Sequence, residues 1–198
     1  PFVPGVFDAA TMIRTLHHMS EPLTSLQQVR NTLKPDSIFI LEFANKRNLK
    51  AIARWLLRKQ SWNPFDPAPV EFAELNFDFH PKTVRSWLEN IGFAIERQLS
   101  VSHFRLPILK KVIPLNLLVA LDSAVQWTGV YWQFSPSIFV RCRAIGEETD
   151  ISNGSFWKCP DCHATDLSTI EKGLHCKACN KVWALRDGIY DFREPLQE

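Results

Sequence analysis

Four cysteines near the end of the chain have the side chains and the spacing of a metal site. They form two Cys-x-x-Cys pairs, Cys159 with Cys162 and Cys176 with Cys179. Two such pairs about a dozen residues apart offer four thiolates in two tight turns, which is the ligand set of a closed tetrahedral zinc site. The segment is also too short to build a large apolar core without a metal. We therefore predict one structural Zn²⁺ bound by these cysteines in a zinc ribbon over residues 155–198.

Two other chemistries use the same residue type. The four thiols could instead form two disulfides, which require an oxidising compartment, or one pair could be a redox motif, which would leave the second pair without a role. His163 and His175 flank ligand positions, but four cysteines already fill a tetrahedral site. Cys142, the fifth cysteine, lies in an apolar strand pattern and is expected to be a buried small hydrophobic residue.

The first part of the chain alternates between strand and helix patterns. Phe7 to Ile13 has the apolar character of a buried parallel strand. A helix is expected next, with Ser20 as its N-cap and Pro22 in its first turn, and the apolar run from Ile38 to Phe43 predicts a second strand. A strand, helix and strand joined by short connections form a right-handed parallel crossover, so the predicted fold class is α/β.

The remaining patterns complete one larger domain, predicted over residues 1–146. A helix from Leu49 to Lys59 is expected to bury its leucines and to present Lys50, Arg54 and Arg58 to solvent. A further helix opens at Pro81 and stops at Gly92. Strands are expected over 93–101 and 137–143, with a helical aromatic insertion over about 103–134 between them. Polar residues 147–154 are predicted to link this domain to the ribbon.

Several short matches in this domain follow one another in the order of a known family. The run resembles the second half of a class I S-adenosylmethionine-dependent methyltransferase, whose fourth strand, fifth strand and antiparallel edge carry similar signals. The fold implied is a partial Rossmann-like sheet of parallel strands with an antiparallel edge. The matching segments are Pro1-Phe2, Phe7-Asp8-Ala9-Ala10, Leu16-His17-His18, Leu33-Lys34-Pro35, Glu42-Phe43 and Ile91-Gly92-Phe93.

This resemblance implies a cofactor, S-adenosylmethionine, and also a missing part. The family grips the cofactor with a Gly-rich loop after its first strand and an acidic residue after its second, and neither is present in this sequence. We therefore expect the chain to be a fragment of a longer enzyme that binds the cofactor poorly alone. Because ligands lie beyond the carboxyl ends of parallel strands, the resemblance places Ile13, Arg14 and His18 near the cofactor, with Pro1 and Phe2 at its adenine edge.

The ribbon carries a second resemblance. Its cysteine turns and the ending Asp187-Gly188-Ile189 are similar to the small zinc-ribbon subunit that activates tRNA and protein methyltransferases. That likeness implies a module that stabilises and covers a methyltransferase, here fused to it in one chain.

Charge and hydropathy bear on the partner. The 198-residue chain has a formal charge of only +2, and the ribbon holds six Lys or Arg against seven Asp or Glu, which argues against RNA binding by the ribbon. No apolar run reaches the length of a membrane span, so we expect a soluble, cytoplasmic protein.

The expected activity is methyl transfer to a small or lipid-like acceptor reached under the aromatic insertion. In-line transfer from a sulfonium needs neither metal nor strong base, so the sequence nominates no catalytic residue. Two alternatives stay open: a scaffold or binding protein without catalysis, and an RNA-modifying methyltransferase that uses the basic helix.

Overall fold

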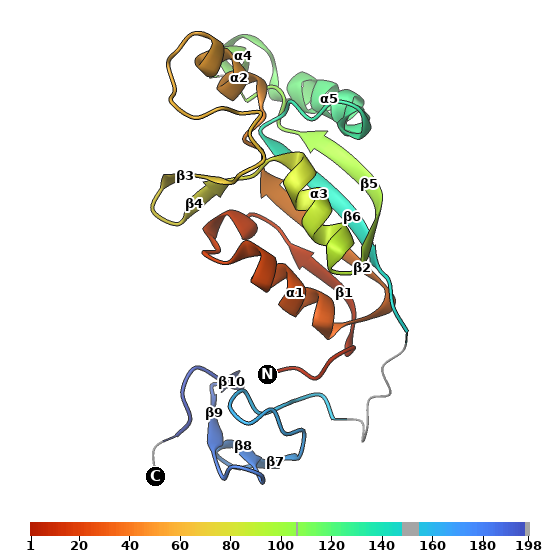
Figure 1. The fold of residues 1–198 in the computed structure, drawn as a ribbon, viewed down its shortest axis with the longest axis vertical. Helices are drawn as coiled ribbons and strands as arrows, with labels where there is room; N and C mark the ends of the chain where they lie inside the picture. The colour runs from red at the N-terminus through yellow and green to blue at the C-terminus, as the bar shows by residue number, and fades with distance from the viewer. Residues whose placement is uncertain (106, 148–154, 197–198) are drawn as a thin grey trace.

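The computed structural model describes residues 1–105, 107–147 and 155–196, as a larger α/β body and a small β module (Figure 1). Most of the linker predicted over 147–154 therefore lies outside the described residues, as do the last two residues of the predicted ribbon. Among the described residues no helix is long and apolar enough to cross a membrane.

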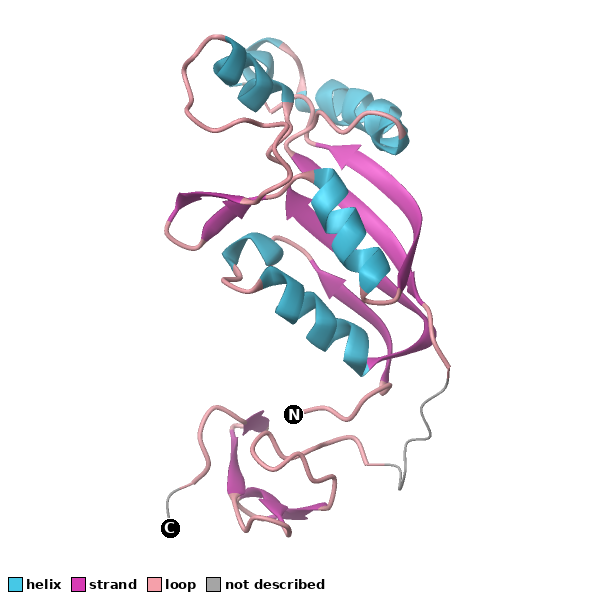
Figure 2. Ribbon diagram, viewed as in Figure 1, coloured by secondary structure: helices cyan, strands magenta, loops and turns pink. Residues whose placement is uncertain are grey.

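The larger body is built on a four-stranded mixed sheet in the order β1-β2-β6-β5. Strand β1 pairs parallel with β2, whereas β6 runs antiparallel to both β2 and β5, so the predicted α/β class is confirmed. Helices α1 and α3 lie on the same face of this sheet (Figure 2). The elements are β1 (Phe7–Met12), α1 (Pro22–Thr32), β2 (Leu33–Ala44), α3 (Pro81–Asn90), β5 (Phe93–Val101) and β6 (Ser137–Ala144).

The core lies between the sheet and these two helices. Alternate residues of β2, namely Phe39, Leu41 and Phe43, are buried against Leu26 of α1 and Leu88 of α3. The opposite face of the sheet is only partly covered and carries an ion-pair cluster in which Glu96 contacts Arg141 and Arg143. The sheet is thus apolar on one side, whereas parallel strands are usually buried on both.

Two local expectations were wrong. Ser20 does not cap α1, because the residue before the helix is Glu21 and no side chain caps the first turn. The sequence also predicts a Pro-rich loop between the helix that starts at Leu49 and the helix that starts at Pro81, but this segment holds a hairpin, β3 (Val70–Ala73) and β4 (Asn76–Asp78). A short 3₁₀ helix, η1 (Leu16–His18), follows β1. By contrast, Gly92 follows the C-cap residue of α3 with a φ of +90°, as the sequence predicts for a helix-stopping glycine.

A helical cap lies beyond the carboxyl ends of β1 and β2 (Figure 1). It consists of α2 (Leu49–Leu56) with the loop to Phe65, and of the insertion at 103–134, which contains α4 (Pro107–Val112), α5 (Leu115–Val125) and η2 (Gln126–Val130). The backbone amide of Leu49 donates to the carbonyl of Phe134 at 2.9 Å, which ties the two parts together. These two parts, residues 49–65 and 103–134, together form the cap.

The orientation of α2 contradicts the sequence-based expectation. Leu49, Leu56 and Leu57 are 64%, 67% and 65% exposed, and the only fully buried residue of the helix is Ala51. The helix therefore turns its leucines outward, because its small Ala51 side faces the body.

The small module is an antiparallel meander in the order β10-β9-β8-β7. Its core is formed by Cys159, Leu174, Cys176 and Trp183, so two of the predicted ligands also belong to its interior. The strands are β7 (Leu167–Ile170), β8 (Gly173–Cys176), β9 (Val182–Arg186) and β10 (Ile189–Asp191).

Candidate functional site

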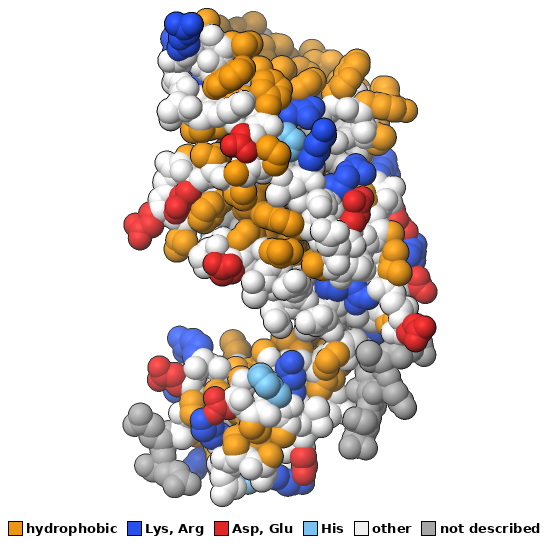
Figure 3. All heavy atoms as spheres, viewed as in Figure 1, with side chains coloured by type: hydrophobic (Ala, Val, Ile, Leu, Met, Phe, Trp, Pro, Cys, Tyr) orange, Lys and Arg blue, Asp and Glu red, His pale blue; other side chains and the backbone are white. Residues whose placement is uncertain are grey.

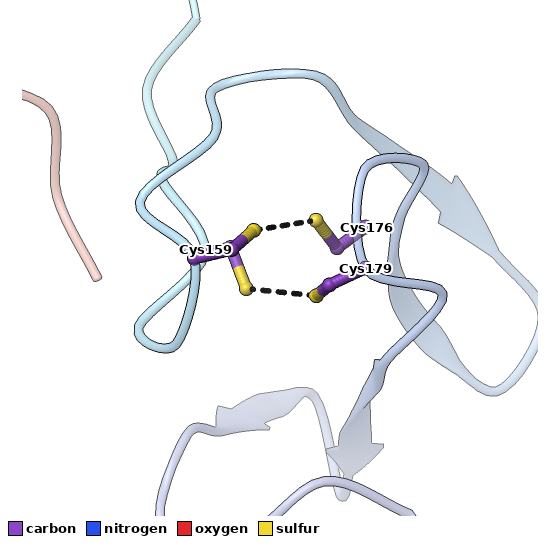
Figure 4. Close-up of side chains that lie close together, drawn as sticks. Cys159, Cys176 and Cys179 are labelled. Carbon is purple, nitrogen blue, oxygen red and sulfur yellow. Dashed lines mark hydrogen bonds between the residues drawn. The ribbon is translucent and has the colours of Figure 1, made fainter.

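The four cysteines of the small module converge on one point. Their sulfur atoms all lie within 4.8 Å of one another, with Cys159 3.7 Å from Cys179 and Cys162 3.5 Å from Cys176. Figure 4 shows the side chains of Cys159, Cys176 and Cys179 directed toward one another. Zinc–sulfur bonds of about 2.3 Å in a tetrahedron separate the sulfurs by about 3.8 Å, so this cluster fits a Zn²⁺ ion.

The protonation of these thiols also fits a metal site. The backbone amide of Lys181 lowers the pKa of Cys179, but burial and the three neighbouring thiols outweigh it and raise this pKa to about 12. Burial opposes ionisation of Cys159, yet the nearby backbone amide of Cys162 acts against this effect, and the pKa of Cys159 is lowered. Four thiolates this close need a cation to ionise together, and a divalent metal supplies that charge.

The N-terminus of the chain joins the small module to the body. Phe2 forms a bridge with Trp157, and the two rings stack at 5.2 Å between centroids. The carbonyl of Pro1 accepts a hydrogen bond from the Lys158 amide at 2.8 Å. Pro1 and Phe2 line a hollow of about 580 Å³ along β1, together with Lys158 of the module.

Ile13 and Arg14 lie at the other end of β1, in a second hollow of about 350 Å³. This hollow opens where β1 and β2 end, which is where open α/β sheets bind ligands. The structure therefore brings Ile13 and Arg14 together but places Pro1 and Phe2 elsewhere. The lining is Ile13, Arg14, His17, Glu42, Ala44, Phe72, Asn76, Asp78, Val101, Ser102, Arg105, Pro136, Ser137 and Phe139.

Glu42 fixes the floor of this second hollow. It is 7% exposed, and its Oε2 accepts a 2.8 Å hydrogen bond from the backbone amide of Arg14, while Oε1 accepts one from the Ser137 hydroxyl. Arg14 adopts a left-handed φ of +56°, which costs energy for a residue with a Cβ and is compensated by this bond. One carboxylate near the carboxyl end of β2 thus links the end of β1 to the start of β6.

Two titratable groups face the hollow with displaced pKa values. Burial raises the pKa of Asp78, although Arg54 and Lys46 oppose it. Burial lowers the pKa of His17, and His18 and Arg14 add to this effect while Glu42 opposes it. The Nδ1 atom of His17 is buried without a hydrogen-bond partner among the described residues. Both groups are therefore held toward their neutral forms beside an open space.

Three other polar residues that follow β1 and β2 make hydrogen bonds outside the lining of the hollow, and the predicted site residue His18 is one of them. His18 is not among the residues that line the hollow, and its Nδ1–H donates to the carbonyl of Leu75 at 3.0 Å. Asn45 donates to the carbonyls of Gln133 and Ser135, and Lys46 donates to the carbonyl of Ala68 at 2.6 Å. These contacts brace the loop after β2 against the cap and the Pro-rich loop.

Asp78 and Ser137 line the hollow but were not predicted from the sequence, because no local motif marks them. Asp78 is placed at the hollow by the β3–β4 hairpin, in a segment whose proline content predicts a loop. Ser137 is placed there by the antiparallel pairing of β6 with β2, opposite Ala44. The Leu16-His17-His18 segment could have indicated His17, but the prediction placed the neighbouring His18 at the site.

The residues present do not complete a site for S-adenosylmethionine. Within 1–105, 107–147 and 155–196, no glycine follows the carboxyl end of β1 or β2, so the backbone cradle that a nucleotide-like cofactor needs is not formed by these strands. The second hollow instead offers carboxylate, imidazole, hydroxyl and guanidinium groups.

No protein-family model matches the sequence, and no curated protein matches it. Several solved structures similar to the chain are described as S-adenosylmethionine-dependent methyltransferases, and another is the [4+2]-cyclase SpnF, at 18% identity and a TM-score of 0.44. One is a complex of the Haloferax volcanii Trm112 methyltransferase activator with a methyltransferase, at 14% identity and a TM-score of 0.43 over 75% of this chain and 58% of that chain. Another, from Thermotoga maritima, gives 14% identity and a TM-score of 0.45 over 72% and 58%.

A third similar structure is an N-methyltransferase from Burkholderia thailandensis with bound S-adenosylhomocysteine, at 13% identity and a TM-score of 0.42 over 72% of this chain and 46% of that chain. The chain thus spans about half the length of these proteins. Identities of 13–14% with TM-scores below 0.5 do not show what reaction the chain carries out.

Proposed function

We propose that this chain is the acceptor-binding half of an S-adenosylmethionine-dependent methyltransferase that carries its own structural zinc ribbon. The observation that supports it best is the hollow at the carboxyl ends of β1 and β2, lined by Arg14, Glu42 and Asp78. It lies beyond a parallel crossover followed by two antiparallel strands, the order that the sequence resemblance implies.

The cofactor half would come from further strands beside β1. Strand β1 pairs only with β2 among the described strands, and all of its residues are exposed or half-buried. A free parallel edge with an uncovered face is a poor end for a sheet, since its backbone groups and apolar atoms remain exposed. Strands added there, with a Gly-rich loop, would supply the ribose and methionine contacts that the chain lacks.

The side chains of the hollow would act on the methyl acceptor. When bound, S-adenosylmethionine supplies the electrophilic methyl group. The Oδ atoms of Asp78 and the unpartnered Nδ1 of His17 could receive a proton from an acceptor hydroxyl or amine, since burial raises the pKa of the Asp78 carboxyl and lowers that of His17, which favours a neutral imidazole. Arg14 and Arg105 line the same space and would hold an anionic group of the acceptor.

The zinc ribbon would support the fold and take no part in the reaction. All four ligand positions of a tetrahedral zinc would be filled by cysteine, which leaves no open position for substrate. The stacking of Phe2 on Trp157 would fix the start of the chain, and with it the edge at which further strands would pair.

A methyl-incorporation assay tests the proposal. The protein extended upstream into the missing half would be incubated with radiolabelled S-adenosylmethionine and with separate small-molecule, lipid and RNA fractions. We expect label in the small-molecule or lipid fraction, and its loss in Asp78→Asn. Label in RNA alone would replace the acceptor class, and no label in any fraction would favour the scaffold alternative.

A further inference from the structure

The cap exposes apolar side chains on every one of its helices. In α5 only Leu118 is buried, whereas Leu115, Leu117 and Val119 are exposed. Helix α4 buries no residue and exposes Ile108 and Val112. Figure 3 shows hydrophobic side chains gathered over this end of the molecule. A continuous apolar surface of this kind on a folded protein marks an interaction site.

Three aromatic side chains project from the same end. Trp127, Tyr131 and Trp132 are 58%, 72% and 65% exposed, and the rings of Trp127 and Tyr131 meet edge to face at 6.4 Å. Trp and Tyr have an apolar body and a polar tip, and they concentrate at the boundary between the acyl chains and the headgroups of bilayers.

The charges around this surface have one sign. Exposed basic residues are Lys50, Arg54, Arg58 and Lys59 on and after α2, and Arg105, Lys110 and Lys111 in the insertion. None of them forms an ion pair with another described residue. The sequence of the cap contains a single acidic residue, Asp122, whose carboxylate is engaged by the amides of Ser102 and His103.

Charge and apolar groups alternate closely enough to act together. Helix α2 turns Leu49, Leu56 and Leu57 outward, with Lys50 and Arg54 beside them, and in α4 Lys110 and Lys111 lie between Ile108 and Val112. Long basic side chains beside exposed leucines can reach headgroup phosphates while the leucines enter the acyl boundary.

We propose that the cap is a docking surface for an anionic lipid bilayer, on which the protein lies with α2, α4, α5 and η2 at the headgroup boundary. The basic residues would contact anionic headgroups, and Trp127, Tyr131 and Trp132 would enter the interface. This inference is independent of methyl transfer, because it concerns where the protein binds and requires no reaction.

The cap lies beside the hollow at the strand ends, so binding of the cap to a bilayer would bring the hollow close to the lipid. Ser102 and Arg105 line the hollow at the strand ends. The same two residues also line a separate groove of about 180 Å³ in the cap, whose lining includes Lys110 and Leu118. A bilayer on the cap would therefore lie next to the mouth of the hollow. A molecule dissolved in the membrane could reach Arg14 and Asp78 with only a short exit from the lipid.

Other occupants fit the surface less well. A second copy would bring two sets of seven unpaired basic residues together, which is unfavourable. RNA would be attracted by the same charges, but it does not use the outward leucines of α2 or the apolar face of α5.

Vesicle co-sedimentation tests the proposal. The purified protein would be mixed with vesicles of phosphatidylcholine alone and with vesicles containing about a third phosphatidylglycerol. We expect binding to the second vesicles at least about tenfold stronger than to the first, with a blue shift of tryptophan emission. Failure to bind either vesicle, or equal binding to both, would overturn the proposal.

Two cap variants and their matched controls locate the surface. Lys110→Glu with Lys111→Glu should weaken binding to anionic vesicles by at least about tenfold, whereas Arg97→Glu with Lys172→Glu, the same change of charge elsewhere, should leave most of it. Trp127→Ala with Tyr131→Ala and Trp132→Ala should also lose binding, unlike Ile189→Ala in the ribbon. Circular dichroism of each variant checks that it is folded.

The same proteins distinguish the rival occupants. Sedimentation equilibrium in the absence of lipid would show self-association, and a titration with total RNA would show nucleic-acid binding. A dimer that dissociates in the Trp127, Tyr131 and Trp132 variant, or tight RNA binding without vesicle binding, would contradict the bilayer proposal. Equal vesicle binding by cap variants and controls would do the same.

Discussion

Glu42 shows how much of the candidate site depends on one side chain. Its two carboxylate oxygens accept hydrogen bonds from the Arg14 amide and the Ser137 hydroxyl, so three strand ends share one buried acceptor. Removing it would leave two donors without a partner, and it would also release the left-handed backbone at Arg14.

Glu42→Ala should therefore lower the free energy of unfolding by about 2–4 kcal/mol. Glu74→Ala, at an exposed position in the β3–β4 turn, is the control and should change it by less than about 0.5 kcal/mol. Urea denaturation followed by circular dichroism measures both. Equal effects of the two substitutions would mean that the carboxylate of Glu42 does not organise the hollow.

Asp78 predicts a pH-dependent stability. Because burial raises its folded-state pKa above the unfolded value, the protonated carboxyl favours folding, and this contribution is lost as pH rises through the folded pKa. Asp78→Asn stays neutral at every pH. It should make the protein more stable than the wild type near pH 7, and this advantage should disappear below about pH 4. A difference that does not vary with pH, in denaturation series at both values, would show that Asp78 is solvated.

At the scale of elements, the sequence located most of the main sheet and the helical segments of the cap, but not the side that α2 turns to solvent. The strand predicted over 93–101 and the stop at Gly92 are confirmed because an apolar run and a left-handed glycine are local signals. The prediction of which face of α2 is buried was wrong, because periodicity shows that the leucines share one side of the helix but not which side packs against the body. The β3–β4 hairpin was missed because Pro64, Pro67 and Pro69 signalled an irregular loop.

The contact of η2 with β5 makes a prediction about one glycine. Gly129 is buried, and a Cβ there would lie only 2.7 Å from the carbonyl carbon of Leu99, which is closer than real side chains approach. Gly129→Ala should destabilise the protein by about 2–4 kcal/mol through this overlap. Gly188→Asn is a suitable control, because its surroundings are open and Asn tolerates a positive φ. Thermal unfolding of the two variants should separate them, and similar midpoints would contradict a tight η2–β5 contact.

The cysteine cluster predicts one zinc per chain. Cys176→Ser should abolish zinc binding and unfold the ribbon while α1 and α3 retain their helical signal, since a structural metal stabilises the module that binds it. Cys142→Ser is the matched control: this thiol is buried in the core of the larger body, where burial and Glu96 raise its pKa to about 12. Elemental analysis and circular dichroism give the readouts. Zinc retained by the Cys176 variant, or lost with Cys142, would refute the assignment.

At the scale of the whole molecule, helices cover one face of the main sheet, whereas its other face and its β1 edge remain exposed. The helix-covered face of the sheet is packed around Phe39 and Leu88, whereas the edge of β1 and the opposite face stay open. Sequence patterns could predict the packed face from its apolar residues. They could not predict that Phe2 stacks on Trp157, because this contact depends on how the N-terminal segment packs against a part of the chain far away in the sequence.

We propose that this chain forms the acceptor half of a methyltransferase, which would need further strands to bind the cofactor. Isothermal titration calorimetry with S-adenosylmethionine tests it most directly, with the present chain and a chain extended upstream by about a hundred residues, the size of the missing half. We predict heat of binding with the extended chain and little or none with the present one. Micromolar binding by the present chain, or no binding by either, would contradict the account.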